Sequence, residues 1–152
     1  MKSLFPTLQQ SYFSVSSQPD TGYTPLFLAR VPAGFPSPAD DYIEEGLDLN
    51  TYLIRRPAST FMFQVVGDSM TGAGIIEGDK VVVDRSITPK NGHIVVAVMG
   101  GDYTLKRLFK TRNCIELHAA NPKYSPIAFN ESSDLQIWGV VVGAVRRYTA
   151  IS

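Results

Sequence analysis

The chain has 152 residues, of which 44% are hydrophobic and 11% aromatic, with 14 basic and 14 acidic side chains and a formal net charge of zero. This length accommodates the core of one domain together with a tail, and it excludes a second full domain. The balanced charge, with basic residues scattered along the sequence, offers no basic face for nucleic acid, so we expect no direct sequence-specific DNA binding.

Residues 1–40 are rich in Ser, Pro, Thr and Gln and show no sustained helical or strand period. We predict that they form an extended N-terminal arm that docks through isolated aromatic residues. Within this arm, Ala33 and Gly34 lie between Pro32 and Pro36. Because proline fixes φ and disfavours helix in the residue before it, this dipeptide is expected to be extended and accessible to a protease cleft.

Residues 41–152 are predicted to form one compact domain that is mostly β. A short helix is expected within residues 40–55, with Asp40 as its N-cap. After Pro57 the pattern changes to short apolar runs separated by turn sequences that are rich in glycine and asparagine. The expected strands cover residues 60–66, 80–84, 93–99, 103–109, 114–119 and 138–147.

Ser69 and Lys106 form a candidate catalytic pair in this domain. Ser69 follows a strand-like run that breaks at a Gly-Asp turn, and Lys106 lies within a second strand-like run with apolar neighbours. A serine hydroxyl is a poor nucleophile until a base takes its proton, and a lysine serves as that base only if burial lowers its pKa. The apolar flanks of Lys106 are expected to provide this burial.

Each of these motifs also has an ordinary structural explanation. A Gly-Asp-Ser turn commonly ends a strand through local hydrogen bonds, and a strand lysine commonly faces solvent. His93 and His118 have no acidic residue at a spacing that indicates a Ser/His/Asp triad. Two histidines and the single cysteine, Cys114, show no ligand spacing, so we expect no metal and no cofactor.

The sequence also indicates in which cellular compartment the protein lies. No apolar stretch approaches the ~20 residues of a membrane span, and no signal-peptide core is visible near the N-terminus. The lone Cys114 excludes an intrachain disulfide and suits a reducing compartment, where it is expected to be a small strand residue. We therefore expect a cytoplasmic protein with no membrane partner.

Taken in order, the motifs resemble those of the LexA family of self-cleaving Ser/Lys peptidases, and most closely its UmuD-type branch. The resemblance covers nearly the whole chain after about residue 30. Its matching segments are Ala33-Gly34, residues 35–42, 48–50, 67–70 and 77–79, Lys106, and residues 138–141. LexA-type repressors also carry an N-terminal helix-turn-helix, for which the segment before Gly34 is too short and too rich in proline, so we do not expect a direct repressor.

The resemblance implies a LexA-like peptidase domain of short twisted antiparallel strands behind the extended arm. It also implies that the chain cuts its own Ala33–Gly34 bond. In this mechanism neutral Lys106 takes the proton of Ser69, which attacks the Ala33 carbonyl. The backbone N–H groups of Asp68 and Ser69 are expected to form the oxyanion hole.

By the same resemblance, we expect a homodimer that partners a Y-family, UmuC-like polymerase for lesion bypass in the SOS response. Cleavage is expected to be stimulated by a RecA-type recombinase filament on single-stranded DNA. Two alternatives stay open at this point. One is an enzyme like bacterial leader peptidase, which shares the Ser/Lys dyad, and the other is a non-catalytic accessory protein that binds a polymerase.

Overall fold

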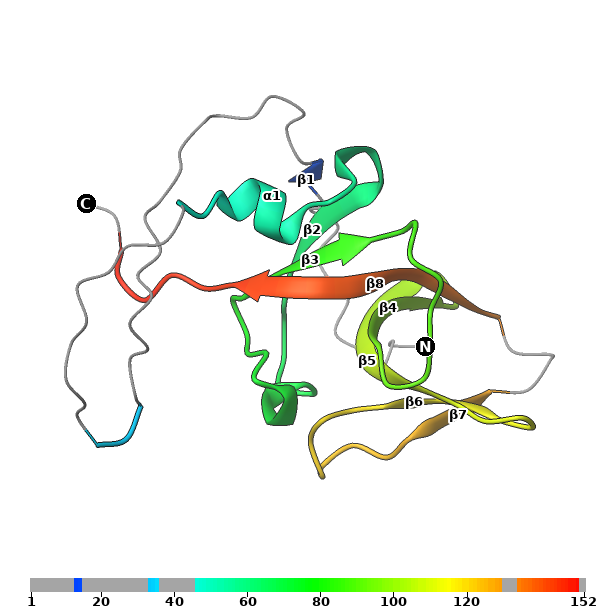
Figure 1. The fold of residues 1–152 in the computed structure, drawn as a ribbon. Coiled ribbons are helices and arrows are strands. Elements are labelled where there is room, and N and C mark those ends of the chain that lie inside the picture. Colours follow the sequence, from blue (N-terminus) through cyan, green and yellow to red (C-terminus); the bar gives the residue numbers. More distant parts are fainter. Residues whose placement is uncertain (1–12, 15–32, 36–45, 130–133, 151–152) are drawn as a thin grey trace.

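The computed structural model describes residues 13–14, 33–35, 46–129 and 134–150, which form a sheet of eight strands in the order β1-β2-β3-β8-β4-β5-β6-β7 (Figure 1). Every neighbouring pair of strands is antiparallel. The prediction of a mostly β fold with short antiparallel strands is confirmed. The helices of the described ranges include none that is long and apolar enough to cross a membrane.

Most predicted strands are present, with small differences at their ends. The observed strands are β1 (Phe13–Ser14), β2 (Thr60–Gln64), β3 (Lys80–Asp84), β4 (Ile94–Met99), β5 (Asp102–Lys110), β6 (Ile115–His118), β7 (Ile127–Phe129) and β8 (Leu135–Val145). The helical elements are α1 (Leu49–Leu53) and two 3-10 turns, Pro57–Ser59 and Thr71–Ala73. The sequence pattern missed β7, whose three residues are too few to show a strand period.

Helix α1 begins later than the sequence indicated. Its N-cap is Asp48, whose side chain accepts a hydrogen bond from the Asn50 backbone N–H at 3.0 Å. The expected cap, Asp40, lies outside the described residues, as does most of the predicted arm. The described parts of the arm are β1, which pairs with β2, and the exposed segment 33–35.

The inner parts of β3 and β4 are buried on both faces, which explains their nearly continuous apolar sequences. Strand β8 crosses the middle of the molecule, with β2 and β3 on one side and β4 to β7 on the other (Figure 1). Alternate residues of β4 enter two separate hydrophobic cores: Val96 packs in one, and Val95 and Ala97 pack in the other. Trp138 packs against the first core, where its ring meets Phe63 edge-on.

Candidate active site

Ser69 lies in a turn that leaves the sheet after β2. Gly67 adopts a φ of +84°, a conformation that disfavours side chains with a Cβ, and it redirects the chain. Met70, which is 2% exposed, then anchors the turn in the first core, and the 3-10 turn Thr71–Ala73 follows. Ser69 is therefore held between a backbone reversal and a buried side chain.

Lys106 approaches this turn from β5, where its neighbours Leu105 and Leu108 are buried. Its Nζ lies 3.1 Å from Ser69 Oγ and donates to Thr104 Oγ1 and to the Leu105 carbonyl, both at 3.0 Å. The side chain is 8% exposed, and no ion pair between described residues involves it. Burial lowers the pKa of Lys106, as the sequence analysis expected from its apolar neighbours.

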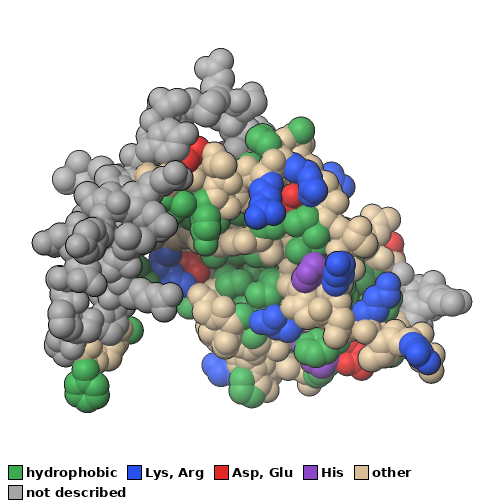
Figure 2. Space-filling model, viewed as in Figure 1, with side chains coloured by type: hydrophobic (Ala, Val, Ile, Leu, Met, Phe, Trp, Pro, Cys, Tyr) green, Lys and Arg blue, Asp and Glu red, His purple; other side chains and the backbone are tan. Residues whose placement is uncertain are grey.

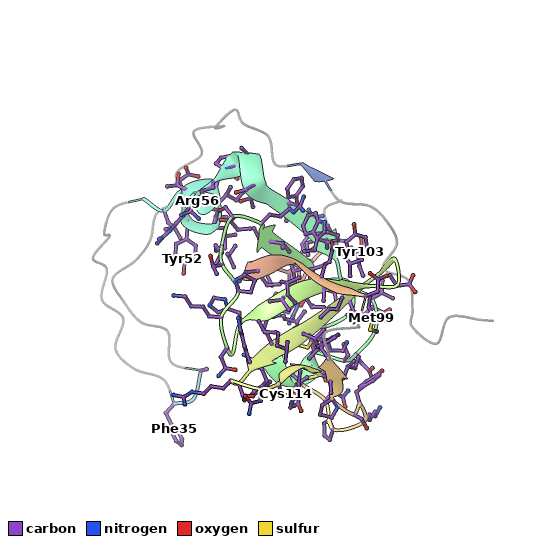
Figure 3. The ribbon with its side chains drawn as sticks, turned by 90° about the vertical axis from the view of Figure 1, so that its right-hand side faces the viewer. Phe35, Tyr52, Arg56, Met99, Tyr103 and Cys114 are labelled. Carbon is purple, nitrogen blue, oxygen red and sulfur yellow. The ribbon has the colours of Figure 1, made fainter. Side chains whose placement is uncertain are left out.

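The two side chains face a cleft of about 370 Å³. Its apolar walls come from three elements, and its lining includes Val65, Val66, Met70, Tyr103, Pro126 and Ile127. Figure 3 labels Tyr103 at the start of β5. This mixture of apolar wall and a few convergent polar groups is typical of a peptide or ligand site.

Two strand segments border the cleft, and each has one edge without a strand partner among the described residues. β5 pairs with β4 from Asp102 to Arg107, but β6 pairs only with the part of β5 from Arg107 to Lys110, which leaves one edge of residues 103–105 open. After β2, Val65 forms hydrogen bonds with Asp79 and Gly78, whereas β1 reaches β2 only at Phe61 and Met62. Open strand edges accept extended peptides by adding a strand.

A loop between β6 and β7 contacts the Ser69 turn, and the two lie side by side in Figure 1. Asn121 Nδ2 donates to the backbone carbonyl of Asp68 at 2.8 Å, and the Tyr124 hydroxyl donates to the Asp68 carboxylate. The Tyr124 hydrogen bond lowers the pKa of the Asp68 carboxyl, with a smaller contribution from Lys123. Hydrogen bonds between described residues leave the backbone N–H of Ser69 without an acceptor, so this donor is available to a ligand.

The Ala33–Gly34 junction lies apart from this cleft. Ala33 and Gly34 are exposed, neither lines the cleft, and a Cβ built on Gly34 meets no atom within 4 Å. Phe35, the next residue, is 93% exposed and is well separated from Tyr103 in Figure 3. The structure thus brings Ser69 and Lys106 together but does not bring the expected cleavage site to them.

The sequence matches a known peptidase family. The family described as Peptidase S24-like matches residues 25–142. The chain belongs to this peptidase family. Protein SamA of Salmonella typhimurium is 48% identical over 130 residues, which are 86% of this chain and 90% of SamA. Protein ImpA of Escherichia coli is 43% identical over 129 residues, 84% of this chain and 87% of ImpA.

A LexA repressor from Syntrophotalea carbinolica is 47% identical over 88 residues, 58% of this chain and 44% of that repressor. The resemblance to the LexA family that the motifs indicated is therefore confirmed. The S24 peptidase match spans Ser69, Lys106 and the Ala33–Gly34 junction. Family membership makes the chain a peptidase, and the roles of these individual residues stay predictions.

The histidines lie away from the cleft of this S24 peptidase. The Nδ1 atom of His93 accepts a hydrogen bond from the Lys90 backbone N–H at 3.2 Å. His118 Nε2 lies 2.6 Å from a Glu116 carboxylate oxygen, and its ring packs against Phe109. Neither histidine lines the cleft that holds Ser69. Across the described ranges, no group of three or more His, Cys, Asp or Glu side chains is placed to hold a metal ion.

Surface charge is mixed on the face shown in Figure 2. Lys and Arg side chains form small separate groups on this face, and apolar and acidic side chains interrupt them. A protein that binds DNA through its phosphates needs a continuous basic surface. This face of the S24 peptidase does not provide one.

An ion pair that the sequence analysis missed anchors the loop after Ser69. Arg146 Nε and Nη2 donate to the two carboxylate oxygens of Asp79, each at 2.6 Å, and Nη2 also donates to the Gly74 carbonyl at 2.8 Å. Asp79 is 1% exposed, and its hydrogen bonds from Arg146 lower its pKa to about 2. The pair fastens the loop to the end of β8.

Proposed function

We propose that this chain is a self-cleaving serine endopeptidase that cuts its own Ala33–Gly34 bond, with Ser69 as nucleophile and Lys106 as general base. The observation that carries the proposal is the 3.1 Å distance between Lys106 Nζ and Ser69 Oγ at a site where burial lowers the lysine pKa. An ordinary lysine, with a pKa of ~10.4, is only ~0.04% neutral at pH 7. Each unit by which the pKa falls raises the neutral fraction about tenfold.

In the proposed mechanism, neutral Lys106 accepts the Ser69 hydroxyl proton while Oγ attacks the Ala33 carbonyl carbon. The backbone N–H groups of Asp68 and Ser69 donate to the oxyanion that forms. The intermediate collapses to an ester on Ser69, and the Gly34 amine leaves with the proton from Lys106. Lys106 then takes a proton from a water molecule whose oxygen attacks the ester carbonyl. The acyl–Oγ bond breaks, Lys106 returns the proton to Ser69 Oγ, and the Ala33 carboxyl group is released.

The open strand edges around the cleft favour an extended peptide as the substrate. Ala33 and Gly34 are exposed, which leaves their peptide bond available to a cleft, but residues 33–35 form a bend and not the extended segment expected from the sequence, so this segment has to straighten as it enters. Glycine after the scissile bond lets the peptide backbone approach Ser69 closely. Cleavage by this route requires the junction to move into the cleft, either within one chain or between two copies.

We extend the proposal to the biological setting implied by the UmuD-type resemblance. The chain would act in the cytoplasm as a homodimer, and a RecA-type filament on single-stranded DNA would stimulate its cleavage during the SOS response. The cleaved dimer would serve a Y-family, UmuC-like polymerase. The similarity to SamA and ImpA over most of their lengths supports this setting.

Mass spectrometry of the purified chain after incubation at alkaline pH tests the catalytic proposal. We expect a single cut after Ala33 in the parent chain and no cut in Ser69→Ala or Lys106→Ala. The double variant should be no worse than either single variant, because the two residues act as one unit. Lys110→Ala, an exposed lysine on the same strand, should cleave normally. Normal cleavage in either dyad variant would contradict the proposal, and an uncut parent would favour the non-catalytic alternative.

A further inference from the structure

The amide of Asn121 has a single orientation, which is fixed from both ends. Its Oδ1 accepts a hydrogen bond from the Lys123 backbone N–H at 3.0 Å. Its Nδ2 therefore points toward the Ser69 turn, where it donates to the Asp68 carbonyl at 2.8 Å. Asn121 and Asp68 are 53 residues apart in the sequence, so this contact depends on the folded arrangement of two loops.

The carbonyl that Asn121 holds belongs to the same peptide unit as the backbone N–H of Ser69. This unit is planar and trans, so its C=O and N–H point in opposite directions, and fixing one fixes the other. A carbonyl that accepts hydrogen bonds also polarises the N–H of its own peptide and makes it a better donor. The Thr71 backbone N–H and hydroxyl also donate to the Asp68 carbonyl, at 3.4 and 3.2 Å. Asn121 makes the shortest of these hydrogen bonds, and it comes from outside the turn, so it contributes to both the direction and the strength of the Ser69 N–H donor.

A second contact keeps the two loops in register. The Gly72 backbone N–H donates to the Ala120 carbonyl at 2.6 Å. A Cβ at Gly72 would lie 2.4 Å from this oxygen, which leaves no room for a side chain. The Ser69 turn is thus held by the loop that carries Asn121 on both sides of the nucleophile.

We propose that Asn121 is a positioning residue for self-cleavage, which presets the Ser69 N–H toward the oxyanion that forms on the Ala33 carbonyl. This inference rests on the proposed function, because it assigns a purpose to the peptide next to the nucleophile. Asn121 touches neither the substrate nor the reacting atoms. It acts through the Asp68–Ser69 peptide, so its loss should lower the rate of acyl transfer more than the reactivity of the nucleophile itself.

Two reactions at position 69 distinguish a loss of oxyanion stabilisation from a loss of reactivity of the nucleophile. Self-cleavage passes through an oxyanion. Alkylation of the thiol at position 69 by iodoacetamide, in a Ser69→Cys chain that also carries Cys114→Ser, needs the nucleophile but forms no oxyanion. Asn121→Asp keeps an acceptor for the Lys123 N–H and places an oxygen, instead of the amide nitrogen, against the Asp68 carbonyl. We expect this change to slow self-cleavage by ~10-fold to 100-fold. In the Ser69→Cys background it should change the alkylation rate less than about twofold.

Two further variants complete the design. Asn121→Ala adds no charge and tests the inference if Asn121→Asp does not fold; it should slow cleavage by about fivefold, as expected for one lost hydrogen bond. Asn113→Asp introduces the same change on the exposed turn between β5 and β6 and should leave both reactions unchanged. Circular dichroism and thermal unfolding establish that each variant is folded.

The outcomes distinguish this inference from the function on which it rests. An uncut parent chain, or a parent whose cleavage survives Ser69→Ala, overturns the proposed function and the role of Asn121 with it. Normal cleavage in folded Asn121 variants overturns the role of Asn121 alone. Equal losses of cleavage and alkylation also overturn it, because they would mean that Asn121 only holds the turn together.

Discussion

Replacing Lys106 with methionine is expected to abolish self-cleavage and to raise the free energy of unfolding at neutral pH. Lys106 is 8% exposed, and burial lowers its pKa. No ion pair between described residues compensates its charge. The buried charge of Lys106 therefore lowers the free energy of unfolding, although the proposed chemistry requires this side chain. An apolar side chain of similar length removes the free-energy cost of burying the charge.

The size of the gain follows from two opposing effects. Replacing buried ion pairs with apolar side chains of similar volume stabilises proteins by up to about 4 kcal/mol, and we use this figure as the upper bound for the buried Lys106. Methionine leaves the Leu105 carbonyl without the hydrogen bond from Nζ, at a cost of about 1 kcal/mol. The Thr104 hydroxyl lines the cleft, where water takes the place of Nζ. We therefore expect a net gain of about 1 to 3 kcal/mol.

Urea unfolding at pH 7, followed by the fluorescence of the single tryptophan, Trp138, measures this gain. All chains carry Ser69→Ala so that none of them cleaves itself during the measurement. Lys110→Met is the matched control because Lys110 is exposed on the same strand. Its free energy of unfolding should change by less than about 0.5 kcal/mol.

The pH dependence of the free energy of unfolding provides a second check on the burial of Lys106. Because its pKa is lower in the folded chain than in the unfolded chain, the unfolded chain binds more protons at pH values between the two. The free energy of unfolding of the chain with lysine therefore rises with pH over this interval. The advantage of methionine should shrink between pH 7 and pH 10. A Lys106→Met chain that is less stable than its parent at pH 7, or an advantage independent of pH, would refute the argument.

Three further predictions concern the loop and the junction. Gly72→Ala should lower the free energy of unfolding by about 1 to 3 kcal/mol and slow cleavage, because its Cβ would lie 2.4 Å from the Ala120 carbonyl oxygen. An unchanged urea midpoint would contradict this, because it would mean that the loop shifts to accommodate the Cβ without loss of stability. The pKa of Asp79, lowered to about 2, makes its ion pair stabilising above pH ~4, with the contribution lost as pH falls toward 2. The urea midpoint of Arg146→Met should thus fall well below that of the parent at pH 7, and the gap should narrow as the pH falls from 4 toward 2; a gap independent of pH would contradict this. Gly34→Glu should block self-cleavage without unfolding the chain, because the new side chain crowds the approach to the nucleophile, whereas a normal cut by mass spectrometry would place the junction elsewhere.

The sequence predicted those parts of the fold that depend on local pattern. Residues 80–84 form β3 as expected, because a run of apolar residues that is buried on both faces is visible without its partners. The burial of Lys106 was predictable for the same reason, since the buried Leu105 precedes it and the buried Leu108 lies two residues after it. The pattern also indicated the turn at Ser69, because glycine and aspartate interrupt an apolar run there.

The contacts that hold the Ser69 turn could not be predicted in this way. Asn121 is followed by proline, so its local pattern indicated only a turn, and its contact with Asp68 spans 53 residues. The Asp79–Arg146 pair spans 67 residues. Neither spacing has a period or a motif that links the partners, and each contact exists only because the sheet brings distant loops together. The approach of the junction to the cleft likewise depends on a movement that no local pattern encodes.

The rate of self-cleavage as a function of pH tests the central claim, that Lys106 is the base for Ser69, most directly. First-order rates are measured from pH 7 to pH 10 in the parent chain and in His93→Gln and His118→Gln. If neutral Lys106 is the base, the rate should rise about tenfold per pH unit until the pH reaches the lowered pKa of the lysine, and both histidine variants should follow the same curve. A rate that levels off near pH 7.5, with the plateau abolished in either histidine variant, would contradict the account and remove Lys106 from the mechanism.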